Sequence, residues 1–260
     1  MSPSWRDRVV VHVARDTVRL RRHARGWRPA PQAVVEAPCD AVDPVSLRAA
    51  LQLLLPSAGK RRPRVSVVLS NDLVRLAMLE GVDELEGSAE RASAARHRLR
   101  AIFGPLADGW RSVVDAGPGV THGVVAAVNG DLLDGLLEGA QAAGLHIDRI
   151  EPWFAVASRG CRVPSNTDLF VVAEPAKVVV ARLRDDHIVA LRGVRLGGEL
   201  VDELPRLLDK MQLLEGTERS GGNVTVVSAA GTPAEFPAHP TWRIAGVSFD
   251  PTALAVGGRS

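Results

Sequence analysis

One short stretch of this 260-residue chain has the residue types and spacing of a phosphate-binding loop. It is DAGPGVT, residues 115–121, which fits the form Asp-x-Gly-x-Gly-x-Thr. Glycines in such loops let backbone N–H groups approach a phosphate, and in the Walker type a lysine contacts it as well. No such lysine follows here, and the stretch lies between two predicted strands, 110–115 and 122–128. A plain hairpin turn is therefore the favoured interpretation.

The residues of other catalytic chemistries show no matching pattern. The seven histidines lack the H-x-x-x-H spacing of a metal site, and no G-x-S-x-G elbow is present for a serine nucleophile. His12 lies in an apolar segment, so a core histidine is expected there and not a base. The two cysteines, Cys39 and Cys161, are too few for a disulfide framework or a four-ligand zinc site. Both are expected to be small buried or half-buried side chains.

The composition is that of a soluble globular protein, with 46% hydrophobic and 24% charged residues. A formal net charge of +2 predicts no affinity for nucleic acid by itself. No apolar run approaches the roughly 20 residues that span a bilayer. The apolar run at the N-terminus is also too short for a signal peptide. We therefore expect a cytoplasmic protein without a membrane span.

The elements that must position any site occur as a repeat of three strands and a helix. The two copies are predicted at 8–13, 17–23, 32–37 and 45–55, and at 169–173, 177–183, 188–196 and 199–214. VVVHVARDTVRL in the first copy corresponds to FVVAEPAKVVVARL in the second. Asp185 and Asp186 are expected to form a tight turn between the last two strands of the second copy.

Between the two copies, residues 122–160 are predicted to form a strand, a helix, a second strand and a second helix, and the second helix is expected to begin at Glu151-Pro152. Asn129 is a good N-cap for the first of these helices, and Gly144 is placed to end it. An amphipathic helix with exposed arginines is expected at 88–103. The remaining strands or extended segments are expected at 65–70, 73–79, 110–115, 224–228 and 242–247.

The stretch VVAAVNGDLLDGLLEGAQAAGLHIDRIEPWFAVASR, residues 124–159, resembles the middle of the PilM and GspL family of actin-like proteins. These are cytoplasmic assembly proteins of type IV pili and type II secretion. The family signatures fall on 143–145 (Ala-Gly-Leu) and on Glu151 with Ala155. Arg75 holds the place of an arginine in the extended segment of the family, although Glu80 stands where a proline is usual.

The resemblance implies an α/β, actin-like fold of two ribonuclease-H-like lobes, each a mixed sheet with helices. The first lobe is expected at 1–157 and the second at 158–260. A ribonuclease-H nuclease needs carboxylates on the first strand of a lobe to hold metal ions. Neither 9–13 nor 169–173 contains one, so nuclease activity is not expected.

The same resemblance locates where an actin-like ATPase would hold a nucleotide. Such proteins bind phosphates between two hairpin turns that typically begin Asp-x-Gly, and they pack adenosine against a Gly-Gly pair. Here the two Asp positions fall on His12 and Val172, and the two Gly positions fall on Ala14 and Glu174. Pro175 follows Glu174 and has no N–H to donate. The adenosine-loop positions are Ala229 and Ala230. We therefore expect no nucleotide cofactor, no metal and no catalysis.

A basic segment, Arg6 to Arg28, contains eight arginines and two histidines. It could meet an acidic partner, anionic lipid or nucleic acid, although the solvated face of a strand pair is the favoured interpretation. Tyrosine is absent from the chain and aromatic residues near the segment are few, which disfavours base stacking. A nucleic-acid adaptor is kept as a third hypothesis, for which charge reversal at Arg19 and Arg21 should abolish binding.

The resemblance thus favours a non-catalytic scaffold of an inner-membrane platform for a type IV pilus or for type II secretion. The expected partner is the cytoplasmic tail of an inner-membrane pilus or secretion protein, with an assembly ATPase as a second candidate. No nucleic-acid partner is expected, and attachment to the inner membrane would be peripheral, through partners. The alternative is a nucleotide-binding actin-like ATPase with unconventional phosphate loops.

Overall fold

The computed structural model describes residues 8–23, 33–54, 64–117, 120–142, 144–161, 163–215, 221–229 and 236–252, without the side chains of 212–215. Its strands are β1 (Arg8–Val13), β2 (Thr17–His23), β3 (Val34–Pro38), β4 (Arg64–Leu69), β5 (Val74–Glu80), β6 (Trp110–Asp115), β7 (His122–Asn129), β8 (His146–Pro152), β9 (Leu169–Glu174), β10 (Lys177–Arg184), β11 (His187–Arg195), β12 (Gly222–Ser228) and β13 (Trp242–Ser248). The helices are α1 (Pro44–Leu54), α2 (Ser88–Phe103), α3 (Gly130–Ala142), α4 (Trp153–Gly160) and α5 (Leu200–Glu215), with 3-10 turns η3 (Val82–Glu84) and η4 (Gly104–Gly109).

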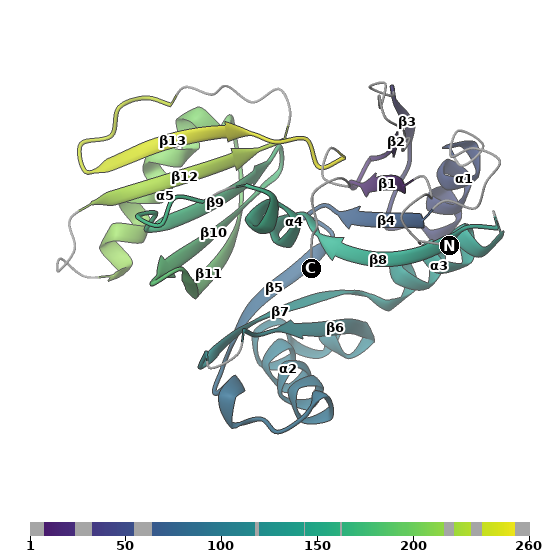
Figure 1. Cartoon of the computed structure of the whole chain (residues 1–260), viewed down its shortest axis with the longest axis horizontal. Helices are drawn as coiled ribbons and strands as arrows, with labels where there is room; N and C mark the ends of the chain where they lie inside the picture. Colours follow the sequence, from purple (N-terminus) through teal and green to yellow (C-terminus); the bar gives the residue numbers. More distant parts are fainter. Residues whose placement is uncertain are drawn as a thin grey trace, which may run out of the picture. The chain divides into compact units, whose positions relative to one another are not determined.

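The first five-stranded sheet has the order β3-β2-β1-β4-β8 (Figure 1). Strand β1 is antiparallel to β2 and parallel to β4, and β4 is parallel to β8. Val9, Val11 and Val13 on one face of β1 and Val10 on the other are almost completely buried, as expected of a central strand that is covered on both faces. The predicted elements of the first copy are confirmed, with boundaries shifted by one or two residues.

Helix α3 begins and ends where the sequence predicts. The Asn129 side chain accepts a hydrogen bond from the N–H of Asp131, at 2.8 Å, and so caps the first turn. Gly144 has a φ of 68°, the left-handed conformation that ends many helices. Helix α1 packs closely on α3, because a Cβ atom on Gly139 would lie 3.0 Å from Cδ1 of Leu51.

The second five-stranded sheet has the order β11-β10-β9-β12-β13. Its strand order and directions repeat those of the first sheet, since β9 is antiparallel to β10 and parallel to β12. One face packs against α5, and the shared core is formed by Leu169, Val171, Ala173, Val178, Val180, Leu200, Leu204, Leu207, Leu208, Met211, Val224, Val226 and Trp242. The predicted repeat of three strands and a helix is therefore confirmed at the level of topology.

A smaller sheet, β5-β7-β6, lies in the chain between the two repeats and carries α2 on one face (Figure 1). Ala95 and Leu99 of α2 are buried against Leu79 and Val125. The Phe103 and Trp110 rings extend this core, with centroids 5.2 Å apart. The helix at 88–103 and the strands around it match the prediction, and Arg96, Arg98 and Arg100 are exposed as expected.

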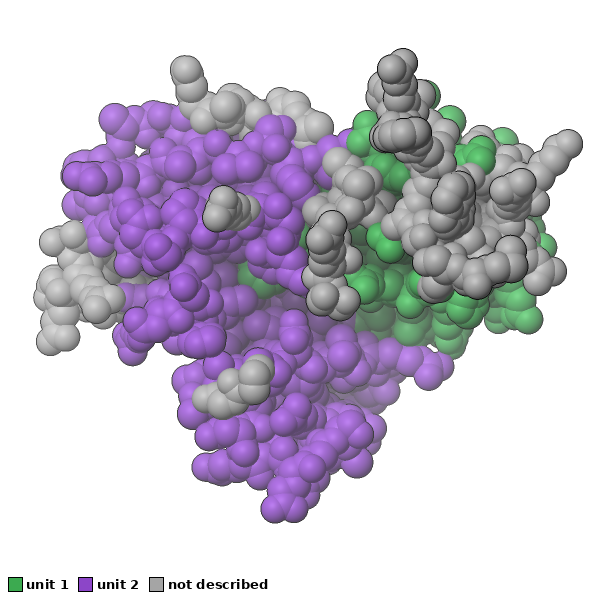
Figure 2. Space-filling model, in the orientation of Figure 1, with its two compact units in different colours: residues 1–74, 128–156, 251–260 green, residues 75–127, 157–250 purple. Residues whose placement is uncertain are grey.

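The contacts divide the chain into two compact units (Figure 2). Unit 1 comprises residues 1–74, 128–156 and 251–260, and unit 2 comprises residues 75–127 and 157–250. The first sheet lies in unit 1, and the second sheet and the small sheet with α2 lie in unit 2, apart from residues at the ends of β5 and β7. The lobe boundary at 157/158 stays a prediction. Within the described residues, no helix is long and apolar enough to cross a bilayer.

Candidate functional site

The first candidate phosphate hairpin is the turn between β1 and β2, in unit 1. His12 is 6% exposed and lies between Arg19 of β2 and Val68 of β4 in the sheet register. The N–H of Ala14 donates to the carbonyl of Thr17, at 2.8 Å, and so closes the turn. Where an Asp-x-Gly hairpin would present a carboxylate and a glycine, this hairpin presents an imidazole and a methyl group.

The carbonyl groups of this turn have protein partners. The oxygens of Arg15 and Asp16 accept hydrogen bonds, both of 2.9 Å, from the N–H groups of Ala41 and Cys39. The Arg15 guanidinium lies 3.7 Å from the Asp72 carboxylate, whose side chain is only 11% exposed. The β1–β2 turn is therefore fastened to the segment before α1 and to the segment after β4.

The second candidate hairpin is the turn between β9 and β10, in unit 2. Val172 is completely buried, and Glu174 is 8% exposed and faces Lys177 across the last pair of the register. The turn itself consists of Pro175 and Ala176, and the carbonyl of Ala176 accepts a hydrogen bond from Leu196. A two-residue turn that contains a proline offers few N–H groups to an anion, and a glutamate beside it repels phosphate.

The third motif is the adenosine-loop pair, Ala229 and Ala230, and only its first residue is described. Ala229 follows β12 directly and is half-buried, whereas Ala230 lies outside the described residues. The two hairpins belong to different units.

The DAGPGVT stretch joins β6 to β7, which are neighbours in the small sheet. The predicted hairpin is therefore confirmed, although its residues 118 and 119 lie outside the described part. The stretch belongs neither to the β1–β2 turn nor to the β9–β10 turn.

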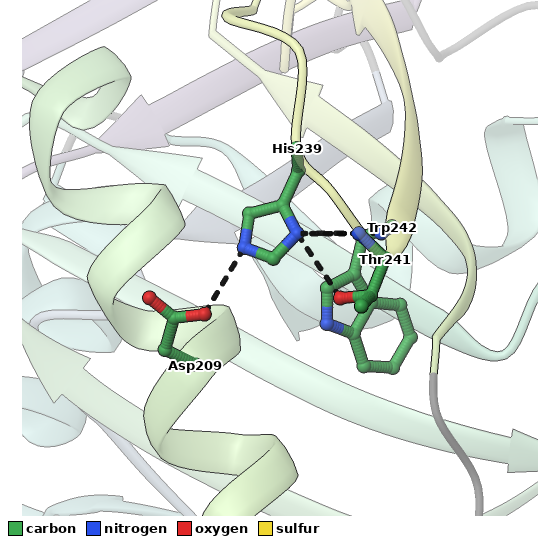
Figure 3. Close-up of polar contacts among 4 residues, drawn as sticks. All are labelled: Asp209, His239, Thr241 and Trp242. Carbon is green, nitrogen blue, oxygen red and sulfur yellow. Dashed lines mark hydrogen bonds and ion pairs between the residues drawn. The ribbon is translucent and has the colours of Figure 1, made fainter.

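An arrangement that the sequence analysis missed surrounds His239 (Figure 3). Its side chain is 3% exposed, and Nε2 lies 3.2 Å from Oδ1 of Asp209 on α5. Nδ1 accepts hydrogen bonds, both of 3.3 Å, from the backbone N–H groups of Thr241 and Trp242. An Nδ1 that accepts from two amides carries no hydrogen, so the ring N–H is on Nε2 and is directed at Asp209.

This order of acid, imidazole and hydroxyl superficially resembles a catalytic triad, because the Thr241 hydroxyl lies 3.2 Å from Nδ1. The two backbone amides already occupy Nδ1, which a triad histidine would need as its base. His239 therefore caps the start of β13 and fastens it to α5. His239 and the Pro240 that follows it form no recognisable sequence motif, so sequence analysis had no signal for this arrangement.

The cysteines have the environments predicted for them. Cys161 is buried and Cys39 is half-buried, and neither forms a disulfide. Burial raises the pKa of Cys161 to about 11. Burial, with smaller contributions from Asp16 and Asp40, raises the pKa of Cys39 to about 11. In the part of the chain that the structure describes, no group of three or more His, Cys, Asp and Glu side chains is arranged to hold a metal ion.

No known family model and no curated protein sequence matches this chain. Several solved structures, however, are similar to it. The cytoplasmic domain of EpsL, an inner membrane component of the type II secretion system of Vibrio cholerae, has a TM-score of 0.58 and 13% identity, over 93% of this chain and 90% of that chain. A chain of a PilM–PilN type IV pilus biogenesis complex has a TM-score of 0.57 and 16% identity, over 86% of this chain and 81% of that chain.

A third similar structure is a Bacteroides thetaiotaomicron protein of unknown function with an actin-like ATPase fold. Its TM-score is 0.58 at 9% identity, and the match covers 87% of this chain and 82% of that chain. At such identities the likenesses show the fold alone. They confirm the predicted actin-like fold and the structural resemblance to the PilM and GspL proteins.

Proposed function

We infer from its actin-like fold and its altered hairpins that this protein is a non-catalytic scaffold. In this proposal it belongs to the inner-membrane platform of a type IV pilus or of type II secretion, and it acts by protein–protein recognition. The likeness to EpsL and to a chain of the PilM–PilN complex supports the choice of apparatus. The fold itself serves many unrelated activities, so the argument depends on the residues of the hairpins.

The observation that carries the proposal is the chemistry of the two hairpin positions. His12 and Val172 are buried and cannot supply the carboxylates that organise a metal ion and the attacking water. Glu174 adds a carboxyl group where a phosphate would need a glycine amide. An enzyme that lacked these groups would lose both the metal and the backbone cradle.

The expected partner is the cytoplasmic tail of an inner-membrane pilus or secretion protein, with an assembly ATPase as a further partner. Such a partner would keep the protein on the cytoplasmic side, attached peripherally. A peptide tail can bind to an actin-like unit by adding a strand to an exposed sheet edge. The described sheets offer edge strands for this purpose, among them β3, β11 and β13.

One observation favours the rival function, an ATPase with unconventional phosphate loops. Asp72 is a carboxylate beside the first hairpin, 3.7 Å from Arg15 of its turn, and it could replace the missing aspartate. A thermal-shift titration with Mg-ATP and Mg-ADP separates the two functions. A nucleotide at about 100 times its dissociation constant would stabilise the protein by roughly 2.7 kcal/mol.

We expect no rise in melting temperature with either nucleotide. A clear rise that disappears in Asp72→Asn would contradict the scaffold proposal and favour the nucleotide-binding alternative, with Asp72 in its site. A rise that persists in Asp72→Asn would also contradict it and would locate the nucleotide elsewhere.

A further inference from the structure

A hollow of about 510 Å³ lies in unit 2 between the ends of two hairpins. One is the β6–β7 hairpin of the small sheet, and the other is the β10–β11 hairpin of the second sheet (Figure 1). All the residues that line it belong to unit 2. The candidate phosphate hairpins do not contribute to it, so it is a separate feature of the molecule.

The polar lining of the hollow is mainly acidic. It includes three carboxylates, against one guanidinium and two imidazoles; the residues are Asp115, Asp185 and Asp186, Arg184, and His122 and His187. None of the three aspartates forms an ion pair with another residue in the described part of the chain. Unpaired carboxylates around a concave surface attract cations, because their fields add within the hollow.

The apolar lining gives the hollow a second kind of contact. Val120 and Val124 come from the β7 side, and Ile188 and Val189 come from β11. All four side chains are half-buried, so a ligand can still cover them. A ligand that fits both kinds of surface has positive charges and adjacent apolar groups.

The backbone conformation of the β10–β11 turn is not the one that aspartate adopts at lowest cost. Asp185 and Asp186 have φ angles of 52° and 63°, the left-handed region. Such a two-residue turn favours Asn-Gly, because asparagine and glycine adopt positive φ at lower cost. Two adjacent carboxylates also repel each other. Aspartate is acceptable at the first position, but glycine at position 186 would give a more stable turn than Asp186.

We propose that this acidic hollow binds a lysine- or arginine-rich segment of the inner-membrane partner. This inference rests on the proposed function, since it specifies the chemistry of the tail that the scaffold would hold. Short cytoplasmic segments next to membrane spans carry an excess of lysine and arginine. Strand β11, which lines the hollow, is also an edge strand of its sheet, so an extended tail could pair with it while its cations meet the aspartates.

The test uses a fluorescent peptide in which lysine alternates with valine, and the full-length protein. Binding is measured by fluorescence anisotropy at low and at high salt. A peptide in which glutamate replaces each lysine has the same apolar content and serves as the control ligand. We expect the lysine peptide to bind and the glutamate peptide not to bind. Added salt should weaken the complex, because exposed charges are screened.

The decisive variant is the double substitution Asp185→Asn and Asp186→Gly. It removes two carboxylates and also installs the preferred turn sequence, so we expect its melting temperature to rise while affinity for the peptide falls about tenfold. Glu199→Gln with Asp202→Asn is the matched control, because it removes two exposed carboxylates that follow the other end of β11 and do not line the hollow. We expect this control to change affinity less than about twofold.

Equal losses in the two double variants would show that only net charge matters, and the proposal would be wrong. Unchanged affinity in the Asp185/Asp186 variant would overturn it as well. Asp115→Asn provides an independent variant on the opposite hairpin, with an expected loss of affinity of about threefold. Failure of these peptide tests leaves the nucleotide titration unaffected, so the scaffold proposal and the tail-site proposal can fail separately.

Discussion

At the scale of single residues, His239 shows how a side chain that could do chemistry can have a structural role. Both ring nitrogens are used, Nε2 toward Asp209 and Nδ1 toward two amides of the β13 start. The backbone N–H of Trp242 is one of these donors. Its side chain belongs to the core under α5, and the residue is 7% exposed. The histidine therefore connects the loop before β13 to that core.

His239→Ala should destabilise the protein by about 1–3 kcal/mol, because two amides lose their acceptor. Asp209→Asn should cost less than about 1 kcal/mol, since the aspartate side chain is 64% exposed. Urea denaturation measures both changes. His239→Asn restores an acceptor at this turn and should recover part of the loss. Equal losses in the histidine and aspartate variants would contradict the capping role.

The raised pKa values of the cysteines predict slow thiol chemistry. With a pKa of about 11, only about a thousandth of each thiol is thiolate at pH 8. Alkylation by iodoacetamide should rise about tenfold per pH unit until about pH 11. Cys39→Ala and Cys161→Ala assign the rates, and urea-unfolded protein is the control. Fast alkylation of the native protein at neutral pH would contradict this prediction.

The raised pKa values of the two cysteines also predict how the free energy of unfolding changes with pH. A thiol whose pKa is higher in the folded state favours folding while it is protonated. That contribution is complete below the ordinary thiol pKa of about 8.5 and declines as the pH rises toward about 11. The free energy of unfolding should therefore decrease in alkali from this cause.

Residue-scale expectations from sequence succeeded where they depended on local pattern. The cap at Asn129, the positive φ of Gly144 and the Asp185-Asp186 turn are all set by neighbouring residues, and all are confirmed. The pairing of His239 with Asp209 could not be predicted, because the two residues lie on separate elements and form no motif. The aspartates around the hollow also lie on two hairpins that are far apart in the sequence, so their proximity could not be predicted.

At the scale of elements, the start of α4 depends on a side chain from elsewhere in unit 1. Asn71, which is completely buried after β4, accepts a hydrogen bond from the N–H of Phe154, at 2.9 Å. Sequence analysis placed the start of this helix at Glu151-Pro152, but both residues belong to β8 and the helix begins at Trp153. The difference arises because pairing with β4 extends β8 to Pro152.

Asn71→Ala should destabilise unit 1 by about 2–3 kcal/mol, because it leaves the Phe154 amide buried without this acceptor. Asp43→Ala removes the cap of α1, where the carboxylate accepts from Val45 and Ser46, but that site is exposed. The expected loss there is about 1 kcal/mol. Urea denaturation of the two variants provides the comparison, and a smaller loss for Asn71→Ala than for Asp43→Ala would refute the buried-cap argument.

At the scale of the whole molecule, the second sheet has a core of its own. All the buried residues of that core lie between Leu169 and Trp242. We therefore expect a fragment of residues 158–250 to fold alone and to unfold cooperatively, by circular dichroism in urea. A fragment of residues 158–215 lacks β12, which joins β9 to β13, and should not fold. A non-cooperative transition in the longer fragment would show that the boundary after residue 157 is misplaced.

The overall architecture could be predicted because three strands and a helix occur twice in the chain. The alternating apolar pattern of the strands is still readable in both copies, although the nucleotide-binding motifs have changed. What sequence analysis did not anticipate is that contacts group the small sheet, apart from the ends of β5 and β7, with the second sheet in unit 2. Grouping of this kind depends on packing between segments far apart in the chain, which local periodicity does not encode.

The discontinuity of unit 1 has a consequence for synthesis on the ribosome. Strand β4 needs β8 as its neighbour, and β8 emerges from the exit tunnel only after the whole small sheet and α3. The small sheet with α2 is local in sequence and can form early, whereas the edge of β4 stays open until β8 arrives. We expect an arrest-peptide assay to report a pulling force from the small sheet first. During the interval before β8, the nascent chain exposes the open edge of the valine-rich strand β4, and an exposed strand edge of this kind favours pairing with other chains.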